Sequence, residues 1–370
     1  MVHILDLRLI EKESMSKKIN QIEPLIDIED EKAVSSYIQS GGWITEHHET
    51  KKLEKNIKNY VERKYAIAVP NGTIAIYLSL LSLGLTKGKR VAVPNLTMIA
   101  TINAIIWAGA IPVLVDVDET LCMSLKSLKK LKNLDAVIFV PLNGRVGSGK
   151  EIERWCKQNK IKLIEDSAHA LGSSYSNKRC GKLGDISIFS FTPHKIITMG
   201  QGGMILTDKK TLSDFIKGIK TFNRFGDKSD FHKGFGLNFK ITDLQASLGN
   251  SQFKKLDKHI EIKRKVLDYY KNTISDELKI IEFNTYEVPW FIDICFKNKS
   301  KRTQAINKLS ELGIETRLSY PPLSKQKYLK KYANNNLNYS ESVYEKVLWM
   351  PSSLNLTKKS ISKICSVINE

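Results

Sequence analysis

Between residues 65 and 207, short apolar segments alternate with helical segments, and this alternation restricts the fold more than any other feature of the sequence. It predicts βαβ crossovers and a mostly parallel sheet with helices on both faces. Ligands of such sheets bind beyond the carboxyl ends of the strands. The expected strands are 65–69, 90–93, 111–115, 136–140, 162–165, 186–191 and 203–207, with helices at 73–83, 97–108 and 150–159.

The flanking segments predict a large unit followed by a smaller one. Amphipathic helices at 29–40 and 49–63 flank a Gly41-Gly42-Trp43 turn, and a long helical segment covers 242–273. A new strand at 288–296 and a helix at 301–312 then begin a smaller α+β unit. We expect an N-terminal extension at 1–28, a large α/β domain at 29–275 and a small α+β domain at 276–370.

The composition is that of a globular protein, with 42% hydrophobic and 26% charged residues in a chain of 370. No apolar run approaches the roughly 20 residues that a membrane-spanning helix needs. Asp6, Arg8 and Glu11 interrupt the apolar residues at the N-terminus, where a signal peptide would be uniformly apolar. We therefore expect a cytoplasmic protein with no membrane partner.

The cysteines and the charge exclude two further classes of protein. The five cysteines lie far apart without a C-x-x-C pair, which favours reduced, buried thiols over a disulfide framework or a metal site. The net charge of +19 is compatible with nucleic-acid binding. However, the lysines are spread along the whole chain, and no basic segment is interleaved with aromatic residues. We expect a solvated, lysine-rich surface that attracts anionic substrates, and no nucleic-acid partner.

Four short segments place polar residues at the ends or turns of predicted strands. A Gly-Thr pair at the start of a helix offers unpaired N–H groups, a hydroxyl and the positive helix terminus, which together suit a phosphate. Each segment is a weak signal alone, because Asn-Gly-Thr also makes a simple helix cap and a lysine after a strand is usually solvated. The segments are Pro70-Asn71-Gly72-Thr73, 163–169, 188–195 with 200–203, and 236–240 followed by Asp243 and Gln245.

Taken together, these segments resemble the DegT/DnrJ/EryC1/StrS family of sugar aminotransferases that depend on pyridoxal 5′-phosphate (PLP). The likeness is most evident from Ile22 to Tyr270 and weaker beyond. The number of matches in the same order makes chance a poor explanation. The matching segments are Ser40-Gly41-Gly42-Trp43, Asn71-Gly72-Thr73, Val115-Asp116-Val117, 165–169, Ser190-Phe191 with Lys195, Gly200-Gln201-Gly202-Gly203, 236–239, 313–317 and 320–323.

The resemblance implies the fold of fold-type I PLP enzymes and assigns the central chemical roles. PLP needs a lysine amine that binds its aldehyde and then moves a proton, and this role falls to Lys195. It also needs a carboxylate that keeps the pyridine nitrogen protonated, and Asp166 matches. Glu165, one position away on the strand, points to the other face of the sheet.

The resemblance also implies the remaining cofactor contacts. Gly72, Thr73 and Ser190 would bind the phosphate from the same subunit. Asn238 would reach the phosphate of a second subunit, so that the protein is a homodimer with shared active sites. His169 stands where the family has Gln or His near the phenolic oxygen of PLP, although an isolated histidine there would more often be a packing residue.

Several positions depart from the family pattern. Gln201 replaces the usual glutamate of the Gly-Glu-Gly-Gly loop, and Met98 stands where an aromatic residue commonly stacks on the cofactor ring. A thioether can still pack on a ring. Lys240 replaces a frequent arginine. His194 precedes Lys195, which matters because a related branch carries histidine at the lysine position and performs dehydration.

The implied reaction moves the amino group of L-glutamate to a nucleotide-linked keto-sugar, expected to be a 4-keto-6-deoxyhexose used for surface polysaccharides or glycans. Arg317 is a candidate for binding the nucleotide diphosphate or the carboxylate of the donor, and Met98, His194 and Lys240 are further substrate candidates. Amination at C3 or a sugar dehydratase would use nearly the same residues. A non-catalytic regulatory protein of the same fold is the alternative of another class.

A glycine-rich segment, Gly144-Arg145-Val146-Gly147-Ser148-Gly149-Lys150, follows a predicted strand as a Walker A loop would. The next residue is Glu151 rather than the Ser or Thr that holds Mg²⁺. We therefore interpret this segment as a βα connection and not as a nucleotide-hydrolysing site.

Overall fold

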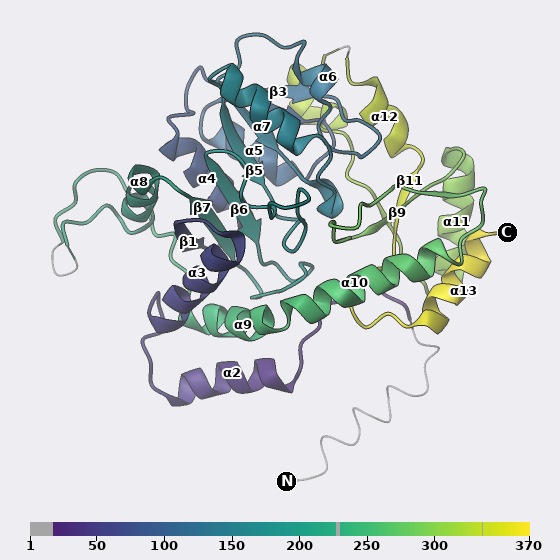
Figure 1. The fold of residues 1–370 in the computed structure, drawn as a ribbon, viewed down its shortest axis with the longest axis horizontal. Helices are drawn as coiled ribbons and strands as arrows, with labels where there is room; N and C mark the ends of the chain where they lie inside the picture. Colours follow the sequence, from purple (N-terminus) through teal and green to yellow (C-terminus); the bar gives the residue numbers. More distant parts are fainter. Residues whose placement is uncertain (1–17, 227–229, 335) are drawn as a thin grey trace.

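The computed structural model describes residues 18–226, 230–334 and 336–370, and it contains a large and a small β-sheet (Figure 1). The large sheet has seven strands in the order β1-β7-β6-β5-β4-β2-β3. Neighbouring strands are parallel except at β7, which is antiparallel to both β1 and β6. The strands are β1 (Tyr65–Val69), β2 (Arg90–Pro94), β3 (Ile111–Val115), β4 (Ala136–Phe139), β5 (Lys162–Asp166), β6 (Ile186–Ser190) and β7 (Gly203–Thr207).

Helices cover both faces of this sheet, because alternate residues of each strand are buried in different cores. In β1, Ile67 packs with residues of α4, α5 and α8, whereas Ala66 packs with residues of α3 and α9 on the other face. The predicted mostly parallel sheet between helices is therefore confirmed. The helices of this part are α2 (Ile28–Gln39), α3 (His48–Val61), α4 (Gly72–Ser82), α5 (Ile99–Trp107), α6 (Leu125–Leu128), α7 (Gly149–Gln158), α8 (Lys210–Lys220), α9 (Asp243–Lys254) and α10 (Leu256–Lys271).

The small sheet has four strands in the order β10-β11-β9-β8, and α13 and α11 pack against it in a core of their own. The elements from β8 onwards are called the small part of the molecule, and the elements from α2 to α10 are called the large part. The long helix α10 runs from the large part to this core (Figure 1). The elements are β8 (Lys279–Ile280), β9 (Ile292–Cys295), α11 (Lys299–Glu311), β10 (Arg317–Leu318), α12 (Asn338–Tyr344), β11 (Val347–Met350) and α13 (Lys358–Ile368), with short 3-10 turns at Leu142–Gly144, Leu323–Lys325 and Lys327–Tyr332.

Two element predictions were wrong in detail. The single helix expected at 242–273 is two helices, which meet at Lys255. The strand expected at 288–296 begins only at Ile292, because the backbone before it bonds elsewhere. The amide of Val288 donates to Ser173 Oγ at 2.9 Å, and the amide of Trp290 donates to the carbonyl of Asn143 at 3.0 Å.

The segment before α2 lies against the small sheet. Ile19 forms a parallel bridge with Ile314, and the amide of Glu23 donates to Ser353 Oγ at 2.9 Å. Residues 1–17, which include most of the expected N-terminal extension and the segment compared with a signal peptide, lie outside the described residues. All cysteines are free thiols, and all but Cys295 are buried.

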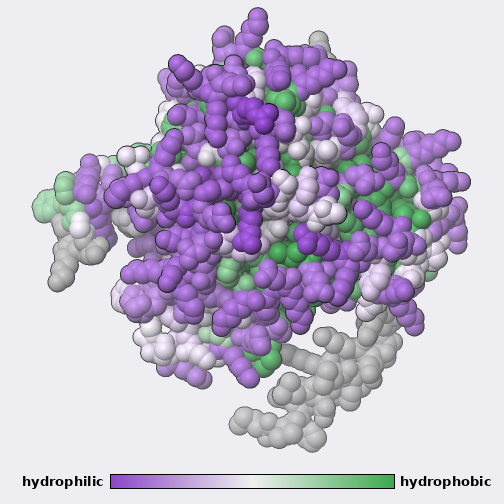
Figure 2. Space-filling view, in the orientation of Figure 1, coloured by the Kyte–Doolittle hydropathy of each residue, from purple (hydrophilic) through white to green (hydrophobic). Residues whose placement is uncertain are grey.

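The surface is predominantly hydrophilic. Figure 2 shows polar residues over most of one face, with hydrophobic residues gathered over the region of β9 and α11. Among the described residues, no helix is long and apolar enough to cross a membrane.

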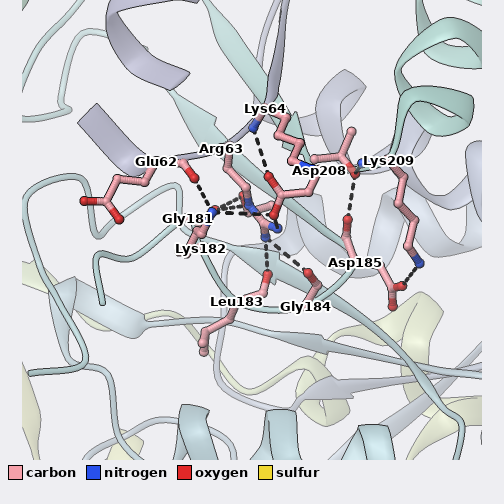
Figure 3. A network of polar contacts seen from close by, with 12 residues as sticks. Glu62, Arg63, Lys64, Gly181, Lys182, Leu183, Gly184, Asp185, Asp208 and Lys209 are labelled. Carbon is pink, nitrogen blue, oxygen red and sulfur yellow. Dashed lines mark hydrogen bonds and ion pairs between the residues drawn. The ribbon is translucent and has the colours of Figure 1, made fainter. Parts of the chain in front are cut away.

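Arg63 connects the segments that precede β1 and β6 in the large sheet (Figure 3). Its guanidinium is almost fully buried and donates to the carbonyls of Gly181 at 2.9 Å and Leu183 at 2.6 Å, and to Asp208 Oδ2 at 3.0 Å. Asp208 also accepts from the amide of Lys64 at 2.9 Å. This network occupies the side of the sheet at which β1 and β6 begin. A ligand can therefore bind at the opposite side, where the parallel strands end.

Candidate functional site

A cavity of about 390 Å³ lies at the carboxyl ends of the parallel strands. Residues that follow β1, β2, β5 and β6 line it, together with residues of the small part. It contains most of the predicted site residues: Gly72, Thr73, Met98, Asp166, His169, Ser190, His194, Lys195 and Arg317. A second cavity of about 630 Å³, between β8, α11 and α13, holds none of them.

One end of the cavity is formed by the first turn of α4 and the end of β6. Asn71 caps α4, since its side chain accepts from the amide of Ile74 at 3.0 Å. The amides of Gly72 and Thr73 lie in the first turn, where a helix offers no internal acceptor. A Cβ at position 72 would lie 3.2 Å from Cβ and 3.5 Å from Oγ of Ser190. Glycine therefore lets two amides and a hydroxyl converge, which is the donor set that a phosphate requires.

Asp166 ends β5 and is 4% exposed. Its Oδ2 accepts from Thr101 Oγ1 at 2.8 Å, and its Oδ1 accepts from the amide of Ala168 at 3.3 Å. Burial raises the pKa of Asp166, while these hydrogen bonds and the charge of Lys195 oppose the shift. Glu165 points to the other face of the sheet, where it accepts from Tyr175 Oη at 2.9 Å.

Lys195 follows β6 in a tight turn in which its amide donates to the carbonyl of Thr192 at 3.0 Å. Its side chain is half-buried, and its amine lies 3.8 Å from the centroid of the Trp290 ring. Burial lowers the pKa of Lys195 to about 7; the charge of Arg317 lowers it further, whereas that of Asp166 opposes the shift. A substantial fraction of the amine is therefore unprotonated and nucleophilic near neutral pH.

His169 lies between Trp290 and Tyr320, with ring centroids 4.0 Å and 5.9 Å away. Burial, with smaller contributions from the charges of Lys195 and Arg317, holds the pKa of His169 well below its usual value, so the ring is neutral. Its Nε2 lies 3.5 Å from Tyr320 Oη, and its buried Nδ1 has no hydrogen-bond partner among the described residues. When the Tyr320 hydroxyl donates to Nε2, Nδ1 carries the proton and is free to donate to a ligand.

The candidate substrate residues lie around the opening of the cavity. Met98 precedes α5 and is 40% exposed. His194 and Arg317 are also exposed and line the cavity. Gln201 reaches the rim, where its carbonyl accepts from Gln245 Nε2 at 3.0 Å.

Asn238 and Lys240 do not line this cavity. Asn238 is exposed and forms an antiparallel bridge with Thr221 in the loop between α8 and α9. Lys240 Nζ lies 6.0 Å from the centroid of the Phe222 ring in the same loop. Within one subunit, these residues are therefore separate from the site.

Thr101 and Trp290 are among the wall residues that sequence reasoning missed. Thr101 lies inside a predicted helix, and Trp290 lies in an apolar run that is typical of a buried strand. Tyr320, which also lines the wall, was noted only as part of a matching segment. Nothing in the local pattern distinguishes these residues from ordinary core positions.

The glycine-rich segment 144–150 packs against the small part of the molecule. A Cβ on Gly144, whose φ is +92°, would lie 1.9 Å from the carbonyl oxygen of Val288. The side chain of Arg145 is 1% exposed and pairs with Asp293 of β9 at 2.6 Å. This closed packing supports its interpretation as a structural connection.

The comparisons with known proteins identify the family. The profile of the DegT/DnrJ/EryC1/StrS aminotransferase family matches residues 24–369. The chain belongs to this family. A GDP-perosamine synthase of Escherichia coli O157:H7 is 35% identical, over 91% of this chain and 92% of that protein. A protein of the same name from Caulobacter vibrioides is 29% identical, over 86% and 88%.

Solved structures agree with this assignment. A DegT DnrJ EryC1 StrS aminotransferase from Brucella abortus superposes with a TM-score of 0.85 at 27% identity, over 92% of this chain and 94% of that chain. Helicobacter pylori PseC, an aminotransferase of pseudoaminic acid biosynthesis, superposes with a TM-score of 0.89 at 22% identity, over 95% and 98%. The fold is that of fold-type I PLP aminotransferases.

The chain is therefore an aminotransferase, and its cofactor is PLP, as in its family. The cavity suits this cofactor on three independent counts. The convergence of α4 and Ser190 suits a phosphate, buried Asp166 suits a pyridinium, and the unpartnered Nδ1 of His169 suits an anionic oxygen.

Proposed function

We propose that the protein transfers the amino group of L-glutamate to the C4 ketone of a GDP-linked 4-keto-6-deoxyhexose. The observation that carries the proposal is the placement of Lys195, Asp166 and the Gly72–Ser190 donor pair around one cavity. The substrate assignment is supported by the names of the GDP-perosamine synthases to which the chain is similar over most of its length.

In this proposal some residues of the site bind the cofactor, and Lys195 also transfers a proton. Bound PLP supplies the electron sink that lets the Cα–H bond of an attached amino acid break. Lys195 would hold the cofactor through its amine, and its Nζ would accept and release the proton at Cα of the donor. Its pKa of about 7 suits a group that must both accept and release a proton at neutral pH.

Asp166 would hold the proton on the pyridine nitrogen through its carboxylate charge. Gly72, Thr73 and Ser190 would bind the phosphate, and His169 would donate from Nδ1 to the phenolic oxygen. These contacts would fix the cofactor at both ends, so that the Lys195 amine would meet the same carbon in every turnover.

The substrate side of the cavity carries positive charge. Burial and, to a smaller extent, the charge of the exposed Arg317 guanidinium lower the pKa of Lys195 and that of His194. We assign Arg317 to an anionic group of the substrate, either the carboxylate of glutamate or the diphosphate of the nucleotide sugar. Met98 and His194 would contact the sugar at the open rim.

A second copy of the chain would complete the site. The loop between α8 and α9 extends from the body of the molecule (Figure 1), and Figure 2 shows hydrophobic residues on it. Phe225, Phe231 and Phe235 in this loop are 55%, 79% and 72% exposed. Such exposed aromatic side chains are typical of an interface. In a homodimer, this loop would bring Asn238 and Lys240 to the cavity of the other subunit.

Product analysis tests this function. The purified protein is incubated with PLP, L-glutamate and GDP-4-keto-6-deoxymannose, and the products are identified by mass spectrometry and NMR. We expect 2-oxoglutarate and a GDP-4-amino-4,6-dideoxyhexose in equal amounts, and neither with Lys195→Ala. An amino group at C3, or loss of a hydroxyl without amination, would establish one of the alternative PLP reactions. Absence of 2-oxoglutarate with every keto-sugar tested would leave a non-catalytic protein.

A further inference from the structure

Trp290 is held rigidly beside the cavity by all three of its polar groups. Its amide donates to the carbonyl of Asn143 at 3.0 Å, and its carbonyl accepts from Lys263 Nζ at 2.8 Å. Its indole Nε1 donates to the carbonyl of His194 at 2.6 Å. The side chain therefore connects the small part of the molecule to the residue that directly precedes Lys195.

The ring of Trp290 is fixed as well. It stacks on Phe291 with centroids 4.0 Å apart, and it lies at the same distance from His169. Trp290 is 6% exposed. Because the Trp290 ring is closely packed, it cannot shift away from a group that contacts its face.

The group that rests on the ring is the catalytic amine. Lys195 Nζ lies 3.8 Å from the ring centroid, well within the roughly 6 Å over which an indole face attracts an ammonium group. No other lysine amine lies over a tryptophan ring among the described residues.

We propose that Trp290 is a positioning residue for Lys195, whose free amine it holds on its indole face whenever that amine is not bonded to the cofactor. The inference rests on the proposed function, because aminotransfer requires that the lysine leave the cofactor, remain close to it and return. A rigid ring gives the released amine a defined position within the cavity. Without it, a side chain with four rotatable bonds would sample many positions.

The same contact has an electrostatic consequence. Burial disfavours the charged form of Lys195 and lowers its pKa to about 7. An indole face favours the ammonium form, and thus opposes the lowering of the pKa by burial. Weakening the π-face should therefore lower the pKa of Lys195 further, whereas a residue that only filled space would leave it unchanged.

Fluorinated tryptophan provides a test that preserves the packing. The full-length protein is produced with tryptophan, mono-, di- or trifluorotryptophan, and each preparation is loaded with pyridoxamine phosphate so that Lys195 carries a free amine. Trace labelling with acetic anhydride between pH 5 and 10, followed by peptide mass spectrometry, gives the titration midpoint of Lys195. The exposed Lys210 serves as the internal reference.

We expect the midpoint to fall stepwise with fluorine content, by about one pH unit over the series. Trp290→Leu should show a similar fall, and Trp290→Phe a smaller one, because phenylalanine keeps a weaker π-face. Trp107→Leu is the control, since this exposed tryptophan stacks on Tyr77 and does not line the cavity, and its midpoint should equal that of the wild type.

Equal midpoints across the fluorinated series, in preparations with equal melting temperatures, would overturn the proposal even if Trp290→Leu did not fold. Because pyridoxamine phosphate is supplied directly, the labelling does not depend on any sugar substrate. A protein that failed to aminate keto-sugars but showed the stepwise fall would thus contradict the proposed function alone.

Discussion

The hydroxyl of Thr101 donates a 2.8 Å hydrogen bond to Oδ2 of Asp166, and both residues are buried at the base of the cavity. Thr101 comes from α5 and Asp166 from β5, so the bond joins a helix to a neighbouring strand end. A carboxylate in such a position needs donors, because burial raises its pKa and favours its neutral form.

Thr101→Val should therefore slow the half-reaction with glutamate. The change removes the donor, raises the pKa of Asp166 and weakens its hold on the pyridinium proton. A hydrogen bond to a charged group contributes roughly 1.5–3 kcal/mol, which corresponds to a tenfold to hundredfold loss in rate. The rate is measured from the change in visible absorbance after glutamate is added. Thr101→Ser keeps the donor and should retain most of the rate; equal rates for the Val variant and wild type would contradict this role.

Gly72→Ala should weaken PLP binding without unfolding the protein. The added methyl group would lie 3.2 Å from Ser190 Cβ and would occupy the space between the two phosphate donors. We expect an increase of at least about tenfold in the dissociation constant, measured by fluorescence titration of PLP-free protein. Ser82→Ala, at the other end of α4, is the control and should bind PLP normally. Normal binding by the Gly72 variant would place the phosphate elsewhere.

The capture of PLP by cofactor-free enzyme should depend on pH through Lys195. Only the unprotonated amine attacks the aldehyde, so the rate should rise with pH, with a midpoint at about 7, and level off above it. Removing the charge in Arg317→Gln should raise the pKa of Lys195 and move the midpoint upwards by about half a unit or more. The rate of capture is measured by stopped-flow absorbance at the same PLP concentration for the wild type and the variant. Because PLP itself titrates identically in both experiments, a difference in the midpoint comes from the protein. An unchanged midpoint in the variant would show that Arg317 does not act on this amine.

The strands and their ends were predictable from sequence because strand burial and chain direction leave local signals. The run from Leu163 to Asp166 shows both, since apolar residues mark a buried strand and two acidic residues mark its end. Alternation along a strand also separates the roles of Glu165 and Asp166, and the structure places them on opposite faces. The order of the matching segments along the chain then indicated the family.

The wall of the site contributed by the small part of the molecule could not be predicted in this way. Trp290 owes its place to bonds with Asn143, His194 and Lys263, which are distant in sequence. The same bonds explain why the strand expected from residue 288 begins later. The glycine-rich segment around Gly144, by contrast, was interpreted as a structural connection, and its glycine accommodates the carbonyl of Val288.

The buried pair Arg145–Asp293 should be a major source of stability between the large and small parts. Asp293 Oδ2 lies 2.6 Å from the guanidinium, and both Asn143 Nδ2 and Trp349 Nε1 donate to the same carboxylate. Asp293→Asn keeps the shape but leaves the Arg145 charge buried without its counter-ion, which should cost about 3–5 kcal/mol of unfolding free energy.

Urea denaturation followed by circular dichroism measures this loss. The control is Asp214→Asn, which removes the partner of Lys210 in a pair with both side chains more than half exposed. Because solvent screens such a pair, that change should leave the free energy of unfolding nearly unchanged. If both variants lost equally little, the connection between the two parts would depend on apolar packing around Trp349 and Phe291 rather than on the ion pair.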